Sequence, residues 1–227
     1  MKIIAVGDVH GRDHWKKIEP DYYDRIVFVG DYVDNLSIDN DTILKNLKAI
    51  IALKNKFPEK VILLLGNHDI QYSEYPTDYR CSGFSEEMQP AYTKLFTENK
   101  SLFQVAAQFG DYLFTHAGLS LNFVQHSLMP WSESILEKKL NVADLLNYIH
   151  DSDQQYLLHT VGKARGGSDP FGGITWADVS ETCTSLLPGY HEVVGHTPVK
   201  RIRKIGNGVS SITYIDTQNN FYEIKFT

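Results

Sequence analysis

Five short apolar runs constrain the fold of this chain more than any other feature. Each run is followed closely by a glycine and by polar side chains, and the runs cover Lys2–Val6, Arg25–Val29, Val61–Leu65, Tyr112–Thr115 and Glu192–Val194. Runs this short and this rich in β-branched and other aliphatic residues are typical of buried β-strands. A chain with several such strands needs helices or a second sheet to cover them.

A helix is predicted between the second and third of these strands. Asp41 is the candidate N-cap, Pro58 follows the C-terminal end, and a helical stripe is formed by Ile43, Leu44, Leu47, Ile50 and Ile51. The order strand, helix, strand predicts a βαβ unit and therefore an α/β protein.

Two later segments have different patterns. Residues 132–159 are helical in periodicity, with Ser132 and Asn141 as candidate caps. Near the C-terminus, Ser211–Ile215 and Phe221–Phe226 are rich in β-forming residues and flank Gln218, Asn219 and Asn220. This arrangement predicts a β-hairpin.

Length and charge narrow the class of protein. A chain of 227 residues without internal repeats or a linker is expected to form a single domain over residues 1–227. The 22 Lys and Arg residues are outnumbered by 28 Asp and Glu residues, which gives a formal net charge of −6. This balance argues against a nucleic-acid partner, because phosphate backbones require a basic face. Oligomeric state is left open.

Cysteine usage and hydropathy indicate a cytoplasmic protein. Cys81 and Cys183 form no CxxC pair, so neither a zinc knuckle nor a disulfide framework is predicted. The first residues reach polar side chains too early to resemble a signal peptide. The apolar runs are also too short to span a bilayer, so no membrane partner is expected.

Polar side chains with metal-binding chemistry follow all five predicted strands. The carboxyl ends of strands in open α/β sheets are where ligands bind, so we expect these residues to meet at one edge. A single aspartate there is usually a turn or cap residue, and a single histidine is usually structural. Together, however, they supply both the oxygen and the imidazole ligands that divalent metals accept. The candidate ligands are Asp8, His10, Asp31, Asn67, His116 and His196.

The ordered set of motifs GDVHG, GDYVD, GNHD, HAG and GHTP resembles the calcineurin-like metallophosphoesterases, and it is most similar to their phosphoprotein phosphatase branch. That branch includes bacterial Ser/Thr phosphatases and symmetrical diadenosine tetraphosphate hydrolases. The resemblance covers nearly the whole chain. It implies a four-layer β-sandwich of two mixed sheets flanked by helices, here with a helical insertion around residues 132–159.

The resemblance also implies a dinuclear metal site with Asp31 as the bridging ligand. One metal would take Asp8 and His10 in addition, and the other would take Asn67, His116 and His196. Oxygen and nitrogen ligands without sulfur fit Mn²⁺ first, with Fe or Zn as alternatives. The implied reaction is attack on phosphorus by a hydroxide that bridges the two metals.

The family's general acid corresponds to His68, and the carboxylate that orients it corresponds to Asp34. An imidazole suits protonation of a leaving alkoxide at neutral pH. Arg165, between small residues, is the first candidate for gripping the phosphate. The family commonly has an arginine directly after its second motif, where this chain has Asn35; Arg80 is the candidate second cation.

Three functions are consistent with this pattern. The leading hypothesis is a Ser/Thr-type phosphoprotein phosphatase acting on phosphomonoesters. The alternative enzyme is a dinucleoside polyphosphate hydrolase of the diadenosine tetraphosphate type, and a preference for phosphotyrosine or small phosphoesters is also open. A metal-binding scaffold without catalysis is disfavoured, because neither His68 nor Asp34 is needed to hold metal.

Overall fold

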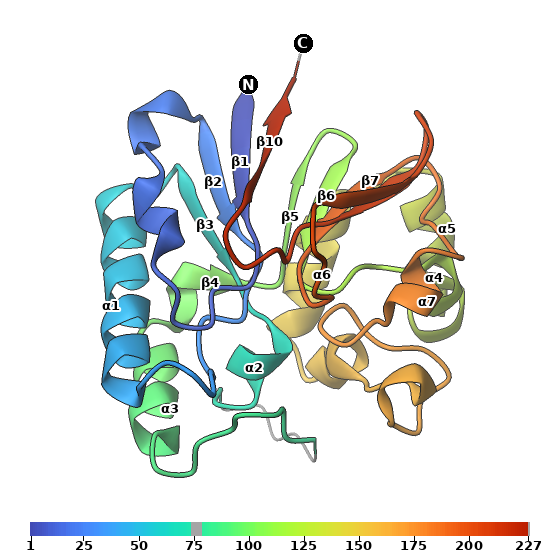
Figure 1. Cartoon of the computed structure of the whole chain (residues 1–227). Coiled ribbons are helices and arrows are strands. Elements are labelled where there is room, and N and C mark those ends of the chain that lie inside the picture. Colours follow the sequence, from blue (N-terminus) through green and yellow to red (C-terminus); the bar gives the residue numbers. More distant parts are fainter. Residues whose placement is uncertain (74–78, 227) are drawn as a thin grey trace. The chain divides into compact units, whose positions relative to one another are not determined.

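The computed structural model describes residues 1–73 and 79–226 and divides the chain into two compact units (Figure 1). The first unit comprises residues 1–104 together with the C-terminal segment from Thr217. The second comprises Val105–Asp216. Each unit is built around one five-stranded sheet.

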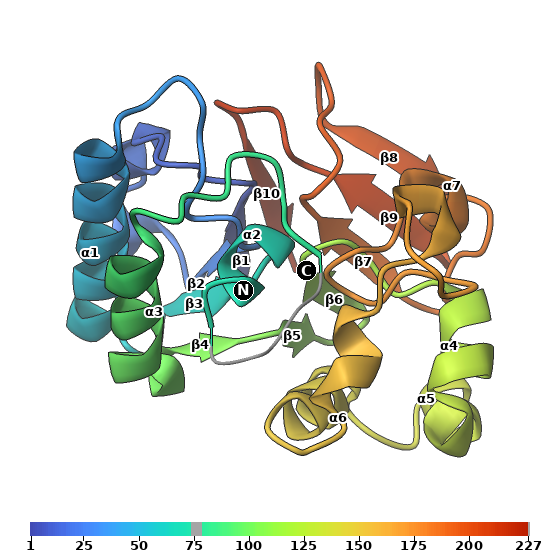
Figure 2. The same ribbon diagram turned by 90° about the horizontal axis from the view of Figure 1, so that it is seen from below.

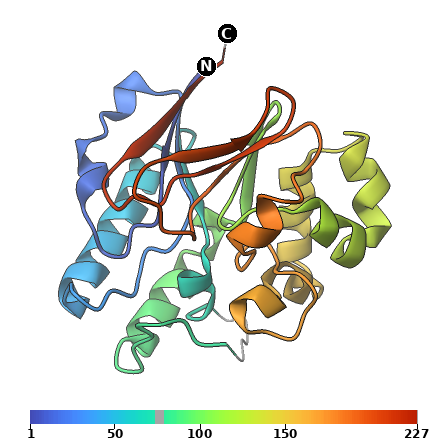
Figure 3. The same cartoon turned by 45° about the vertical axis from the view of Figure 1, so that its right-hand side comes forward.

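The first sheet has the strand order β10-β1-β2-β3-β4. The strands β1 to β4 are mutually parallel, and β10 pairs with β1 in the antiparallel direction, as the dark red and blue strands of Figures 1 and 3 show. Their bounds are Lys2–Val6 (β1), Arg25–Phe28 (β2), Val61–Leu64 (β3), Phe103–Gln104 (β4) and Phe221–Lys225 (β10). The central strands are buried nearly throughout, as their continuous apolar sequence predicts.

Helices α1 and α3 lie side by side next to this sheet (Figures 1 and 2). The helices of the first unit are α1 (Asn40–Lys56), α2 (Asn67–Ile70) and α3 (Gln89–Glu98), with 3₁₀ helices η1 (His14–Lys17), η2 (Pro20–Tyr22) and η3 (Lys100–Leu102). The predicted βαβ unit is confirmed, because α1 connects the parallel strands β2 and β3.

The second sheet has the order β5-β6-β7-β9-β8 and is also mixed. Strands β6, β7 and β9 are parallel, whereas β5 and β8 are antiparallel to their neighbours. The bounds are Ala106–Phe109 (β5), Tyr112–Thr115 (β6), His191–Val194 (β7), Arg203–Gly206 (β8) and Ser211–Tyr214 (β9). Two mixed sheets with helices confirm the predicted α/β class.

The predicted helical segment 132–159 lies in the second unit as several short helices (Figure 2). Within this segment lie α5 (Ser132–Leu136), α6 (Val142–His150) and the 3₁₀ helix η5 (Gln155–His159). The other helices of the second unit are α4 (Leu121–Ser127) and α7 (Val179–Thr182), with 3₁₀ helices η4 (Met129–Trp131) and η6 (Lys163–Arg165). Helix α6 packs on β5 through its apolar face.

The predicted C-terminal hairpin is wrong. The strands β9 and β10 belong to different sheets, because β9 pairs with β7 and β8 while β10 pairs with β1. The hairpin partner of β9 is β8, which the sequence analysis missed because its side chains are mostly exposed and charged. The signal that indicates this turn is Asn207 followed by Gly208.

Two predicted helix caps are also wrong. The N-cap of α1 is Asp39, whose carboxylate accepts the Thr42 N–H at 2.9 Å, and Asp41 lies within the first turn. Ser132 is the first residue of α5 and donates its hydroxyl to the Met129 carbonyl. Asn141 is confirmed as the cap of α6. Asp39, Asn40 and Asp41 are all polar, so backbone geometry decides which of them caps α1. The N-cap position of α5 is Trp131, whose side chain makes no cap hydrogen bond, because the preceding 3₁₀ helix η4 leads directly into α5.

A buried carboxyl in β7 makes stability depend on pH. Glu192 is 1% exposed, and its Oε2 accepts the Leu119 N–H at 2.6 Å. Burial raises the pKa of Glu192 to about 8, from an ordinary value of 4.5. Between these two values the folded protein binds a proton that the unfolded chain has released. The free energy of unfolding should therefore fall as pH rises through this window, by up to about 1.4 kcal/mol per pH unit.

Urea unfolding measured from pH 5 to pH 8.5 tests this expectation. Glu192→Gln should flatten the dependence, because the amide does not titrate. Glu137→Gln removes an exposed carboxyl of the same unit and should leave the slope as in the wild type. Equal slopes for the wild type and Glu192→Gln would refute the role of this group.

Candidate metal centre

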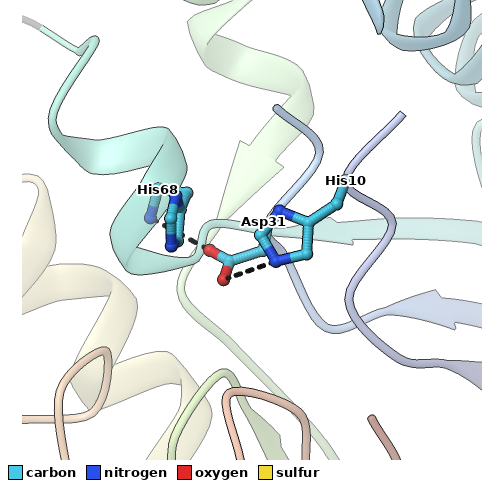
Figure 4. Close-up of side chains that lie close together, drawn as sticks. All are labelled: His10, Asp31 and His68. Carbon is cyan, nitrogen blue, oxygen red and sulfur yellow. Dashed lines mark hydrogen bonds and ion pairs between the residues drawn. The ribbon is translucent and has the colours of Figure 1, made fainter. Parts of the chain in front are cut away.

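Three of the predicted strand ends meet in the first unit, at the carboxyl ends of the adjacent parallel strands β1, β2 and β3. Asp8 and His10 follow β1, Asp31 follows β2, and His68 lies in α2 directly after β3. One ligand atom each of His10, Asp31 and His68 lies within 4.8 Å of the others, and the Asp31 carboxylate lies between the two imidazoles (Figure 4). A carboxylate oxygen of Asp8 is likewise within 4.8 Å of one of Asp31.

The loops that carry these residues adopt unusual backbone conformations. His10, Asp31 and Asp34 all have positive φ, at 44°, 54° and 62°. Residues other than glycine rarely occupy this region, and such positions concentrate at functional sites. Gly11 has φ +74°, and a Cβ there would lie 2.6 Å from Cγ1 of Ile43, so only glycine fits between this loop and α1.

The tautomer of His10 is set by the backbone. Its Nδ1 lies 2.8 Å from the carbonyl oxygen of Val33, which can only accept a hydrogen bond. Nδ1 therefore carries a proton, which leaves Nε2, 3.6 Å from Oδ2 of Asp31, as the ring nitrogen available to a metal. A histidine that donates one ring nitrogen to the protein and presents the other as a lone pair is arranged as metal ligands are.

Asp69 fixes the backbone of the loop that contains Asp31, a role that the sequence did not reveal. Its buried carboxylate accepts the N–H groups of Asp31 at 2.7 Å, Tyr32 at 2.8 Å and Gly66 at 2.8 Å. These bonds link the ends of β2 and β3 and hold Asp31 in its left-handed conformation. Asp69 is part of the GNHD motif, but its place in the motif does not reveal that its carboxylate binds backbone N–H groups.

His68 and Asp34 form a hydrogen-bonded pair next to Asp31. Nδ1 of His68 lies 2.9 Å from Oδ2 of Asp34, and the His68 N–H donates to Oδ1 of Asp31 at 3.0 Å. Burial lowers the pKa of His68, whereas the nearby carboxylates of Asp31 and Asp34 raise it. Because the carboxylates together have the larger effect, the pKa of His68 lies above its ordinary value. The carboxylates therefore favour the protonated ring, and Nε2 is the nitrogen from which it can donate a proton.

Asn67 has a buried partner that orients its amide. Its Nδ2 donates to Sγ of Cys81 at 3.0 Å, and both residues are buried. Because the amide nitrogen is used in this way, the carbonyl oxygen is the atom that Asn67 offers as a ligand. Burial raises the pKa of the Cys81 thiol above its usual range, so the sulfur is present as an uncharged thiol.

The residues of the first unit fit a divalent metal. Two buried carboxylates as close as Asp8 and Asp31 repel each other when both are charged, and a cation between them removes this repulsion. The His10 imidazole adds a nitrogen ligand of correct tautomer. This donor set of oxygens and nitrogens is the one that Mn, Fe and Zn sites use.

The other two predicted strand ends follow strands of the second sheet, so the five ends do not share the edge of a single sheet. His116 follows β6 and His196 follows β7, and these strands are parallel neighbours. Nε2 of His116 and Nδ1 of His196 are 3.2 Å apart. Two imidazole nitrogens about 3.3 Å apart can bind the same tetrahedral metal ion, given metal–nitrogen distances of about 2.0–2.1 Å. His196 also has a positive φ, of 60°.

Arg165, in η6, is fixed beside the end of β7. Its Nε lies 2.7 Å from Oδ2 of Asp178, and its Nη2 donates to the Thr197 hydroxyl at 3.4 Å. Thr197 follows His196 directly in the chain. The ion pair therefore holds the guanidinium next to a predicted ligand segment.

Arg80 and Asn35 have different surroundings in the first unit. Arg80 is exposed, with its guanidinium 3.9 Å from the centre of the Phe84 ring. Asn35 replaces the family's usual arginine and supports the loop that contains His10 instead: its Nδ2 donates to the His10 carbonyl at 2.9 Å.

Three tyrosines follow the third strand end, at positions 72, 75 and 79. Tyr72 is fully buried, Tyr79 is exposed, and Tyr75 lies outside the described residues.

Comparison with known proteins identifies the family. Residues 1–205 match the family model described as calcineurin-like phosphoesterase. The chain belongs to this family. The five motifs, spread from Asp8 to His196, all fall within the matched region, which confirms the resemblance seen in the sequence.

The chain is similar to individual proteins at modest sequence identity. A Schizosaccharomyces pombe protein assigned as a serine/threonine-protein phosphatase is 33% identical over 137 residues. That match covers 55% of this chain but only 41% of the relative's length. A cold-active protein-tyrosine phosphatase of a psychrophilic Shewanella species has a similar fold, with a TM-score of 0.60 and 18% identity over 98% of this chain and 74% of the other.

Within residues 1–73 and 79–226, none of the helices has both the length and the apolar character needed to cross a bilayer.

Proposed function

We propose that this chain hydrolyses phosphomonoesters with two bound metal ions and acts as a Ser/Thr-type phosphoprotein phosphatase. The observation that carries the proposal is the His68–Asp34 pair placed beside Asp31. A metal-binding scaffold needs ligands only. An imidazole held through Nδ1 by a buried carboxylate next to those ligands is the arrangement that general acid catalysis requires.

The proposed ligands keep the assignment made from sequence, with Asp31 as the bridge. Asp8 and His10 would hold one metal together with Asp31, and Asn67, His116 and His196 would hold the other. When bound, the two metals, Mn²⁺ in the first instance, supply Lewis acidity toward the phosphoryl oxygens and lower the pKa of the attacking water. Arg165 and Arg80 are the proposed contacts to the remaining phosphate oxygens.

Proton delivery is the step that the chain's own residues perform. As the bond from phosphorus to the leaving oxygen breaks, that oxygen gains negative charge and needs a proton. His68 donates it from Nε2, while Asp34 accepts the hydrogen bond from Nδ1 and stabilises the charged ring. The product alcohol leaves, and the ring regains a proton from water.

Substrate class follows less directly, because folds of this kind serve many substrates. The S. pombe relative is assigned as a serine/threonine-protein phosphatase, which supports phosphoserine or phosphothreonine. The structural neighbour is named as a tyrosine phosphatase, so phosphotyrosine is the first competitor. Dinucleoside polyphosphate hydrolysis is the second.

A side-by-side measurement of kcat/KM with Mn²⁺ tests the proposal. The substrates are a phosphoserine peptide, the phosphotyrosine peptide of the same sequence, and diadenosine tetraphosphate. We expect the phosphoserine peptide to exceed the dinucleotide by about tenfold or more, a difference of about 1.4 kcal/mol in transition-state binding. The reverse order would assign the chain to nucleotide hydrolysis. Hydrolysis of none of the three would contradict the proposal.

A further inference from the structure

The carboxylate of Asp34 has more hydrogen-bond donors than a simple acid pair requires. Its Oδ2 accepts from Nδ1 of His68 at 2.9 Å and also from Nε2 of Gln71. Its Oδ1 accepts from the hydroxyl of Tyr72 at 2.6 Å. The Asp34 side chain is 1% exposed, and Gln71 and Tyr72 are also buried. Three side chains, rather than one, therefore determine where this carboxylate lies.

We infer that Gln71 and Tyr72 are positioning residues for the general acid, an inference that rests on the proposed function. They hold the Asp34 carboxylate in one orientation, and the carboxylate in turn holds the His68 ring with Nε2 directed away from Asp34. A carboxylate that accepts only one hydrogen bond can rotate about its last side-chain bond. An imidazole ring that is hydrogen-bonded to it can then change its orientation as well. With both oxygens bound by buried donors, that rotation is blocked.

The backbone from Cys81 to Ser85 holds the two positioning side chains in turn. The Cys81 N–H donates to Oε1 of Gln71 at 2.8 Å, which fixes the amide so that its nitrogen faces Asp34. The Ser85 N–H donates to the Tyr72 hydroxyl at 2.8 Å, which leaves the hydroxyl proton for Asp34. Each side chain thus accepts from the backbone and donates to the same carboxylate.

Packing of the same segment reinforces this arrangement. Gly83 has φ +84°, and a Cβ there would lie 3.4 Å from Cβ of Asp34, so the segment approaches the carboxylate closely. The Tyr72 ring stacks on Phe84 with centroids 4.9 Å apart and planes 9° apart. Arg80 covers the Phe84 ring. The proposed phosphate-binding arginine and the general acid are therefore supported by one stack of side chains.

A merely structural network would also bury these contacts, so the test must separate the two roles. General acid catalysis matters most when the leaving group is strongly basic. The test compares phenyl phosphate, whose leaving group is strongly basic, with 4-nitrophenyl phosphate, whose leaving group needs little protonation. A loss of acid positioning reduces kcat on the first substrate more than on the second, whereas general damage to the fold reduces both equally.

Two variants remove different donors: Tyr72→Phe and Gln71→Met. We expect each to lower kcat for phenyl phosphate about tenfold more than for 4-nitrophenyl phosphate, with KM and metal content unchanged. Tyr92→Phe is the matched control, because its ring contacts Tyr72 and its buried hydroxyl has no hydrogen-bond partner among the described residues. It should behave like the wild type on both substrates.

The outcomes separate this inference from the proposed function. Equal losses of kcat on both aryl phosphates, or no loss, in Tyr72→Phe and Gln71→Met would overturn the positioning role. The proposed function would still stand if the wild type hydrolyses these substrates. A wild type inactive on both would defeat the proposed function, and the positioning role is then decided by proton NMR of the protein. The His68 Nδ1 proton should be sharp in the wild type and in Tyr92→Phe and broadened by exchange in Tyr72→Phe and Gln71→Met. Equal sharpness in all four proteins would overturn the inference.

Discussion

Asp31→Asn is expected to lower both metal occupancy and turnover. The Asp31 carboxylate lies within 4.8 Å of ligand atoms of His10 and His68 and of a carboxylate oxygen of Asp8, so it is the common neighbour of the first-unit donors. An amide has one neutral oxygen where the carboxylate has two charged ones, and it cannot bridge two cations with comparable strength. We expect the bound metal to fall from about two ions to about one or fewer, and kcat to fall about 10³-fold.

The substitution should leave the fold intact. Asparagine tolerates positive φ better than most residues, so it can adopt the φ of 54° at this position. The hydrogen bond from the residue 31 N–H to Asp69 is made by the backbone and survives the change. Asp21→Asn, an exposed change of the same kind in the same unit, is the control. Elemental analysis and turnover that match the wild type in Asp31→Asn would refute the two-metal proposal.

His68→Asn is expected to separate metal binding from catalysis. His68 donates its Nδ1 proton to Asp34, so its role as proton donor does not depend on its being a ligand. Metal content should therefore stay as in the wild type, whereas kcat falls about 10²- to 10⁴-fold on a substrate with a basic leaving group. His68 is also close enough to His10 and Asp31 to be a metal ligand itself. If it is a ligand, His68→Asn will lower the metal content as well as kcat.

Metal analysis and kcat on phenyl phosphate are measured on the same preparation. His126→Asn removes an exposed imidazole from α4 and provides the control for the loss of one histidine. Unchanged turnover in His68→Asn would exclude the general-acid role. A parallel loss of metal and activity would instead place His68 among the ligands.

Much of the first unit was predictable because its signals are local. The bounds of β1 and β6 match the predicted runs, and the others differ at their ends by one residue. Apolar continuity marks a buried strand within a few residues, and glycine with a polar residue marks its end. The residues directly after β1, β2 and β3 therefore had to lie at the carboxyl ends of those strands.

Errors arose where the partner of a segment lies far away in the chain. The run at Phe221–Lys225 is a correctly predicted strand, but its partner is β1, more than 200 residues earlier. Hairpin pairing with the nearest strand, β9, was the local interpretation. The distribution of the five strand ends over two sheets also depends on which strands pair with each other. Hydrophobic periodicity predicts that a segment is a strand, but it does not predict the partner of that strand.

The sequence by itself determined which residues are candidates for the chemistry: the metal-ligand candidates follow from residue type and position after strands, and the family resemblance adds the pair His68 and Asp34. Only the tertiary structure decided what holds them. Asp69 ties Asp31 to the end of β3, and Gln71 and Tyr72 converge on Asp34 from the turn after α2. A hydrogen bond depends on distance and direction in space, and residue type shows only that a donor or acceptor is available.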